Sequence, residues 1–237
     1  MAVPHCVSTK QFLVVGNSHT TAISLALSQS LDDRFDVINI ATYFDPENHK
    51  NKTIPDDIVD LFKPEIIFCA FGGSEHNVLG LLEPPNPFDF MDPTDNLYDP
   101  SRNLICYSLI RDVLEKRMRR ALMNLEKIRE LYACPIAHIC SPPPFYELDD
   151  GHVLPRVFQG NDQLSIAPPR LRLKLHRLHS SIFEAACKNL DVFFLKPPDG
   201  AIDDQGFLRR EFMSRDPTHA NALYGSLVVK QLALYAS

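Results

Sequence analysis

The sequence places a serine at the junction between an apolar run and a segment with helical spacing. In FLVVGNSHTTAISLAL, residues 12–27, the apolar residues come first and Ser18 lies where the helical spacing begins. A hydroxyl at a helix N-terminus is surrounded by free backbone N–H groups, which favour a developing negative charge. Ser18 is therefore a candidate nucleophile. Asn17 and Ser18 are also typical helix N-cap residues, so this stretch alone leaves the structural role open.

A serine nucleophile needs a base, and the base needs a group that orients it. The stretch SRDPTHANALYG, residues 214–225, has Asp216 and His219 three residues apart where we expect the last helix to begin. This spacing allows the carboxylate to accept the Nδ1–H of the imidazole, so that Nε2 faces outward. The alternative is again structural, because Asp216 followed by Pro217 is a typical helix start.

A third stretch, CAFGGSEHNV at residues 69–78, follows the third apolar run. Two glycines are followed by polar side chains that we expect at the same sheet edge as Ser18. A glycine turn with solvated polar residues is the plain alternative. The convergence of three separate stretches on one edge favours a site for acyl transfer. The candidate oxyanion and substrate-binding residues are Gly73, Ser74, Asn77, His19 and His76.

These stretches resemble the blocks of the SGNH hydrolases, also called GDSL-type esterases. VVGNSHT resembles the first block and DPTHAN the last, which implies that Ser18 is the nucleophile, Asp216 the orienting acid and His219 the general base. FGGSEHN resembles the third block, and HICSPPPFY resembles the segment after the fourth strand. The resemblance spans nearly the whole chain and implies a flavodoxin-like fold with no cofactor and no metal.

Two positions depart from the family pattern. The asparagine that completes the oxyanion hole aligns with Ser74, and the nearest asparagine is Asn77, so either side chain is a candidate donor. The glycine of the second block is also missing, and Ala41 or Thr42 is a candidate for the N–H that it supplies. Loss of one oxyanion donor typically slows an enzyme by about 10²- to 10³-fold, so these changes are compatible with a slow enzyme.

The resulting prediction is a serine esterase that hydrolyses a small acyl ester, such as an acetyl ester, of a carbohydrate or metabolite. We expect the site to be shallow, as sites at a sheet edge usually are. Two alternatives stay open at this point. The domain could bind a glycan or acyl ligand with weak or no catalysis, or it could transfer the acyl group to a hydroxyl other than that of water.

Other histidines are weaker candidates. His176 and His179 have the helical spacing of two metal ligands, but no third ligand is evident nearby, and we expect both to face solvent. His138 lies in an apolar run and is expected to be a hydrogen-bonded core residue. His19 and His76 each neighbour a proposed catalytic position, and either could bind substrate or exchange roles with His219.

The elements that position these residues follow from hydrophobic spacing. Five short apolar runs are typical of strands buried on both faces, and they cover residues 12–15, 37–40, 66–71, 136–140 and 192–195. Helical patterns separate them over residues 20–31, 54–62, 107–132, 169–190 and 218–235. This alternation predicts parallel pairing, and hence a three-layer α/β/α sandwich around a five-stranded sheet. In such sheets the sites lie beyond the carboxyl ends of the strands.

The helix after Pro168 and Pro169 is expected to bury a leucine stripe and to expose its basic residues, including Arg170, Lys174 and Arg177. Two connections, residues 78–106 and 141–167, are too long for plain turns. Their prolines and aromatic residues favour ordered walls beside the site. We expect a single domain over residues 1–237.

Composition sets the remaining limits. The net charge of −6 disfavours a nucleic-acid partner, and the sequence has neither a signal-peptide pattern nor an apolar run long enough to span a membrane. We therefore expect a cytoplasmic protein with a small-molecule or carbohydrate ester as its partner and no membrane association. The six cysteines form no C-x-x-C pair and are expected to be reduced core residues: Cys6, Cys69, Cys106, Cys134, Cys140 and Cys187.

Overall fold

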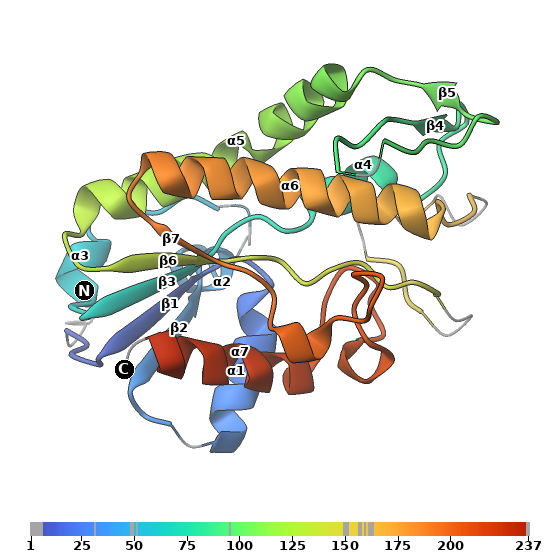
Figure 1. Cartoon of the computed structure of the whole chain (residues 1–237). Helices are drawn as coiled ribbons and strands as arrows, with labels where there is room; N and C mark the ends of the chain where they lie inside the picture. The colour runs from blue at the N-terminus through green and yellow to red at the C-terminus, as the bar shows by residue number, and fades with distance from the viewer. Residues whose placement is uncertain are drawn as a thin grey trace.

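A five-stranded parallel sheet forms the centre of the computed structural model (Figure 1). The structure describes residues 7–30, 32–47, 50, 52–94, 96–148, 152–155, 158, 160 and 164–235. The strand order is β2-β1-β3-β6-β7. The strands are β1 (Phe12–Gly16), β2 (Phe35–Asn39), β3 (Ile66–Ala70), β6 (Ile136–Ile139) and β7 (Phe193–Leu195). All five lie within two residues of the predicted boundaries.

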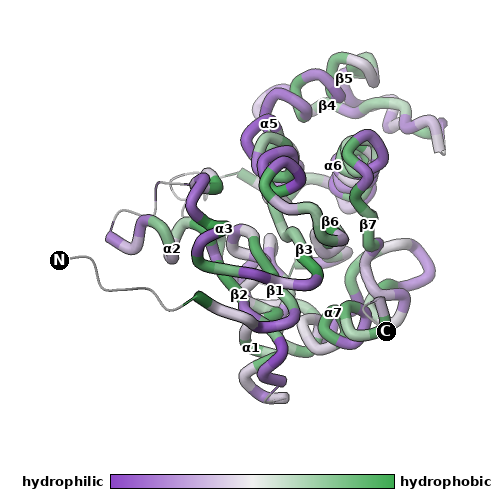
Figure 2. The backbone as a smooth tube through the Cα atoms, turned by 90° about the vertical axis from the view of Figure 1, so that its left-hand side faces the viewer, coloured by the Kyte–Doolittle hydropathy of each residue, from purple (hydrophilic) through white to green (hydrophobic). Residues whose placement is uncertain are grey.

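Helices cover both faces of this sheet. Helices α1 (Thr20–Ser30) and α7 (Ala222–Tyr235) lie on one face, and α5 (Tyr107–Leu131) and α6 (Pro169–Asn189) lie on the other (Figures 1 and 2). Alternate residues of β1 supply both cores, because Leu13 packs in the core under α5 and α6 while Phe12 packs in the core under α1 and α7. The predicted three-layer α/β/α fold class is confirmed.

Two of the predicted helices are shorter than the pattern indicated. The segment 54–62 contains only α3 (Ile58–Leu61), and α7 begins at Ala222 instead of near residue 218. The cap of α7 explains the second difference. The side chain of Asn221 accepts the N–H groups of Leu223 and Tyr224 at 2.9 and 3.2 Å, so Asn221 begins the helix. Asp216 and His219 therefore lie in the turn before α7.

Helix α6 does not expose all of its basic residues, which corrects the expectation for Lys174. Lys174 is fully buried, and its ammonium group donates to the carboxylate of Asp89 and, at 2.7 Å, to the carbonyl of Phe90. Both partners come from the connection between residues 78 and 106. This connection contains the end of α4 (Glu75–Gly80) and two short paired strands, β4 (Phe88–Asp89) and β5 (Asn103–Leu104). It packs over α6 and removes that side of the helix from water.

The two long connections contribute to the core in the parts that the structure describes. Phe90 and Phe145 are both buried, one in each connection. Residues 149–151, 156–157, 159 and 161–163 of the second connection lie outside the described residues. Helix α2 (Ile40–Phe44) completes the described helices around the site.

The cysteines in the described part of the chain are free. Cys69, Cys140 and Cys187 are buried as expected, whereas Cys134 is partly exposed and Cys106 is exposed. Cys6 lies outside the described residues. Among the described helices, none combines the length and the apolar character that a membrane crossing requires.

Candidate active site

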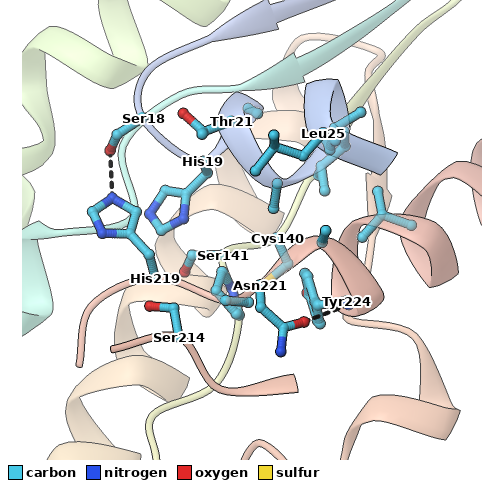
Figure 3. A pocket seen from close by; sticks show the side chains of 18 of the residues that line it. Ser18, His19, Thr21, Leu25, Cys140, Ser141, Ser214, His219, Asn221 and Tyr224 are labelled. Atoms are coloured by element: carbon cyan, nitrogen blue, oxygen red, sulfur yellow. Dashed lines mark hydrogen bonds between the residues drawn. The ribbon is translucent and has the colours of Figure 1, made fainter. Parts of the chain in front are cut away.

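Ser18 and His219 meet at the carboxyl edge of the sheet. The Nε2 of His219 lies 2.7 Å from the Oγ of Ser18 (Figure 3). The Nδ1 of His219 lies 2.9 Å from the Oδ2 of Asp216. Ser18 occupies the turn between β1 and α1, and the two other residues occupy the turn before α7. The structure therefore brings together the three residues that the sequence predicts as a relay.

The two oxygens of Asp216 have separate partners. Oδ1 accepts the backbone N–H and the hydroxyl of Thr218, both at 2.7 Å, which closes the turn. Oδ2 is left for the imidazole of His219. Burial alone would raise the pKa of Asp216, but the hydrogen bonds from His219 and Thr218 outweigh it and lower the pKa below its usual value. The carboxylate is thus charged at neutral pH, as an orienting group must be.

The chain turns sharply after β1 because Gly16 leaves room for β3. A Cβ at Gly16 would lie 2.2 Å from the carbonyl oxygen of Ala70. Asn17 then joins the two strand ends: its N–H donates to Ala70 at 3.0 Å, and its Oδ1 accepts the N–H of Gly72 at 3.2 Å. Asn17 therefore links the loops after β1 and β3. Strand β1 lies between β2 and β3, so the site lies at the switch point of the sheet, where the next strands along the chain are added on opposite sides of β1.

The loop after β3 uses the amide of Gly73 internally. The Gly73 N–H donates to the Oε2 of Glu75 at 2.8 Å, and the same oxygen lies 3.2 Å from the Nε2 of His179. Burial would raise the pKa of Glu75, but its bonds to His179 and to backbone amides lower it. Gly73 has a φ of +103°, a conformation that glycine adopts without strain. Its amide is therefore committed to Glu75 and not free for an oxyanion.

Of the two candidate side-chain donors, Ser74 lies at the site. A pocket of about 170 Å³ beside Ser18 is lined by Ser74 together with Asn39 and Asn17. Asn77 is buried on α4 and does not line this pocket. Ser74 therefore lies beside Ser18, and Asn77 does not.

The second-block N–H is not supplied by Ala41. Its amide donates to the Oδ1 of Asn39 at 3.1 Å, because Asn39 caps α2. Thr42 is exposed and does not line the pocket beside Ser18. Asn39 itself does line it, and the sequence reasoning missed this residue. Its position at the carboxyl end of β2 was the available signal.

The two histidines beside the proposed catalytic positions differ in their surroundings. His19 lines the cavity at Ser18, and its ring centre lies 5.1 Å from that of His219. Burial, and then the charge of His219, lower the pKa of His19 to about 3, so it is neutral at neutral pH. His76 is buried against α6, with its ring 5.2 Å from His176 and 5.0 Å from His179, and burial lowers its pKa well below the usual value.

His176 and His179 do not face solvent, which corrects the expectation from the sequence. Both are buried, because α4 packs against this side of α6. Across the residues that the structure describes, no three metal-ligating side chains are arranged to hold a metal ion. His138 is buried as expected and stacks on Phe183 at 4.1 Å, but its Nδ1 has no hydrogen-bond partner in the described part of the chain.

A cavity of about 430 Å³ opens at Ser18 and His219, in contrast to the shallow site that we expected (Figure 3). It lies between α1, α7 and the carboxyl ends of β3 and β6. The side chains that line its walls are mostly apolar, and they include Ile23, Leu25, Phe71, Ile139, Tyr224 and Val228. Ser18 thus lies between a large apolar cavity and a smaller polar pocket.

The sequence matches no protein-family model and no curated protein. Solved structures are similar over nearly the whole chain. A proposed platelet activating factor from Streptococcus pneumonia shares 14% identity, covering 98% of this chain and 86% of that chain with a TM-score of 0.51. A proposed acylhydrolase from Bacteroides fragilis shares 8% identity, covering 97% and 90% with a TM-score of 0.51. A GDSL-like lipase from Bacteroides thetaiotaomicron shares 11% identity, covering 99% and 93% with a TM-score of 0.45.

The first two of these similarities cover 98% and 97% of this chain, and their low sequence identities mean that they show a likeness of fold alone. The chain therefore shares its overall fold with these two proteins, and this is the three-layer α/β/α class that its sequence predicts.

Proposed function

We propose that this protein is a serine esterase in which Ser18 is the nucleophile, His219 the general base and Asp216 the orienting acid. The observation that carries the proposal is the continuous relay, 2.7 Å from the hydroxyl to the imidazole and 2.9 Å from the imidazole to the carboxylate. Both distances are within the range that proton transfer requires. The shared fold with a proposed acylhydrolase is consistent with this chemistry.

The reaction has two halves. In the first, the Oγ of Ser18 attacks the ester carbonyl while Nε2 of His219 takes its proton, and the N–H of Ser18 with the hydroxyl of Ser74 stabilises the oxyanion. His219 then gives the proton to the departing alcohol, which leaves an acyl-serine. In the second half, His219 deprotonates a water that attacks the acyl-serine, and the carboxylic acid departs as Ser18 regains its proton.

The substrate proposed from the sequence is a small acyl ester, such as an acetyl ester, of a carbohydrate or metabolite. The apolar cavity beside His219 has a volume of about 430 Å³, so it also has room for a larger apolar group. This relay needs no metal or organic cofactor, because the serine, the histidine and water supply every proton and bond in the cycle.

A second candidate is a binding domain that keeps this fold but hydrolyses esters slowly or not at all. The observation in its favour is the bond from the Ala41 amide to Asn39, which removes one oxyanion donor. This candidate predicts that the protein binds an acyl or glycan ligand without forming an acyl-serine.

Hydrolysis of nitrophenyl acetate and nitrophenyl butyrate, together with labelling by a fluorophosphonate, tests the proposal. We expect turnover and labelling in the wild type, and loss of both in Ser18→Ala. Ser28→Ala is the matched control, because Ser28 is exposed on α1 and its hydroxyl donates to the carbonyl of Leu25 within the same helix. Turnover that survives in Ser18→Ala would overturn the mechanism. Addition of an acceptor alcohol distinguishes hydrolysis from acyl transfer by the products formed.

A further inference from the structure

The polar pocket at Ser18 opens into a wider groove along α5. The groove has a volume of about 720 Å³, and four residues line both it and the pocket. These shared residues are Lys52, Glu75, Arg120 and Asn124. A molecule that reacts at Ser18 can therefore extend along the outer surface of α5.

The groove is positively charged although the chain has a net charge of −6. Three glutamates line it, Glu75, Glu126 and Glu130, and one of them, Glu75, is occupied by the Gly73 amide and His179. The basic residues that line it are twice as numerous and are Lys52, Lys116, Arg117, Arg119, Arg120 and Lys127. A net excess of positive charge in a concave surface attracts anions.

The two cations that line the pocket at Ser18 have no acidic partner among the residues that the structure describes. Lys52 and Arg120 are exposed, and neither forms an ion pair with any residue that the structure describes. Lys127 differs, because the carboxylate of Asp56 pairs with it. Lys52 and Arg120 are thus available for an anionic group of a ligand.

Asn124 ties the backbone at Lys52 to α5, the helix that carries Arg120. It is buried on α5, one turn beyond Arg120, and its Nδ2 donates to the carbonyl of Lys52 at 2.6 Å. Its Oδ1 accepts the N–H of Ile54 at 3.1 Å. An anion bound in the part of the pocket that Lys52 and Arg120 line would be attracted by both charges.

We propose that the groove binds an anionic oxygen group, a carboxylate or a phosphate, that is part of the ester substrate. This inference rests on the proposed function of Ser18. The substrate is then an amphipathic ester: its apolar half lies in the cavity beside His219, and its anionic half lies between Lys52 and Arg120. Arginine suits this role because its guanidinium group donates two parallel hydrogen bonds to such groups.

Matched pairs of esters test which half carries the charge. Nitrophenyl hemisuccinate has a carboxylate where nitrophenyl pentanoate has an ethyl group on the acyl side. Butyrylglycerol phosphate and butyrylglycerol differ by a phosphate on the alcohol side. We expect the anionic member of one pair to have the higher kcat/KM at low salt. The preference should fall by about 10- to 100-fold in Arg120→Gln, and it should fall in Lys52→Gln and with added salt.

Arg111→Gln is the matched control, since Arg111 is on the same helix but pairs with Glu115 outside the groove. It should keep the wild-type preference. Equal kcat/KM values within both pairs, or a preference that Arg120→Gln leaves intact, would overturn the proposal.

Calorimetric titration with phenyl phosphate separates this proposal from the proposed catalysis. We expect binding to the wild type and to Ser18→Ala, and loss of binding in Arg120→Gln. That result would support the groove even if no ester were hydrolysed. If esters were hydrolysed but phenyl phosphate did not bind and anionic esters were not preferred, the anion-binding role of the groove would be overturned. The proposed esterase mechanism would be unaffected. Binding of a single-stranded oligonucleotide through Arg120, with no binding of phenyl phosphate, would overturn the small-molecule assignment.

Discussion

The imidazole of His219 lies 2.7 Å from the hydroxyl of Ser18, although 201 residues separate them in the chain. One residue follows the first strand and the other precedes the last helix. Their contact depends on the packing of α1 against α7 on the same face of the sheet. The orientation of the imidazole depends in turn on Asp216, which is tied to its own turn by Thr218.

Substitution of Asp216 by asparagine should lower kcat by about 10⁴-fold, because an amide cannot stabilise the imidazolium or hold the correct tautomer. The fold should persist, since the asparagine oxygen can still accept the two bonds from Thr218. The measurements are kcat for a nitrophenyl ester and the melting temperature. A variant with kcat near the wild-type value would show that Asp216 does not orient the base.

Removal of the Ser74 hydroxyl should lower kcat by about 10²- to 10³-fold with little change in KM, as expected for a donor that acts on the oxyanion. Ser74→Asn should retain more activity than Ser74→Ala, because an amide can donate from the same position. Asn77→Ala is the comparison. Since Asn77 is buried and does not line the pocket, its loss should lower the melting temperature more than kcat. The reverse pattern would assign the oxyanion to Asn77.

Acid should destabilise the protein well above the range in which carboxylates titrate. Burial lowers the pKa of His19 and His138 to about 3 and that of His176 to about 4. Below the usual histidine pKa of about 6.5 the unfolded chain binds more protons than the folded one, so the unfolding free energy falls as the pH falls. Each histidine contributes a slope of about 1.4 kcal/mol per pH unit.

Urea unfolding between pH 7.5 and pH 5 measures this slope. His138→Leu should reduce it by about one histidine's contribution, whereas His152→Leu, at a half-buried position, serves as the control. A slope that is unchanged in His138→Leu would show that His138 takes up its proton in the folded state.

Lys174→Met should lower the unfolding free energy by about 3–5 kcal/mol, because it leaves the carboxylate of Asp89 buried without a cation. Lys10→Met provides the contrast. The pair between Lys10 and Asp36 is partly exposed, so its loss should change stability by about 1 kcal/mol or less. Denaturant unfolding measures both losses of unfolding free energy. Similar losses in the two variants would contradict the conclusion that the ion pair between Lys174 and Asp89 is buried.

The sheet and the relay were predictable because their signals are local. A strand buried on both faces is a continuous apolar run, and a serine after such a run or an aspartate three residues before a histidine can be recognised without the fold. The burial of Lys174, His176 and His179 could not be predicted in the same way. It depends on α4 and the connection 78–106, which pack on α6 from distant positions in the chain.

The place of Asn39 in the wall of the pocket at Ser18 was only partly predictable, since its position at the end of a strand was the one local signal. An asparagine after a strand is typical of a helix cap, and Asn39 does cap α2. Asn39 also lines the pocket at Ser18 because β2 pairs with β1. The sequence of β2 does not specify which strand will be its neighbour. Likewise, the apolar cavity is lined by residues of α1, α7 and the ends of β3 and β6, which lie far apart in the chain.

Gly225 sits directly against α1, where a Cβ would lie only 2.0 Å from the carbonyl oxygen of Ala22. The two helices that flank Ser18 and His219 therefore touch main chain to main chain. No side chain at this contact can change its rotamer, so the contact fixes the distance between α1 and α7 near the two ends of the chain. Any larger residue at position 225 would push α7 away from α1. Because His219 lies just before α7, this shift would move its imidazole away from the hydroxyl of Ser18, although position 225 is not part of the relay.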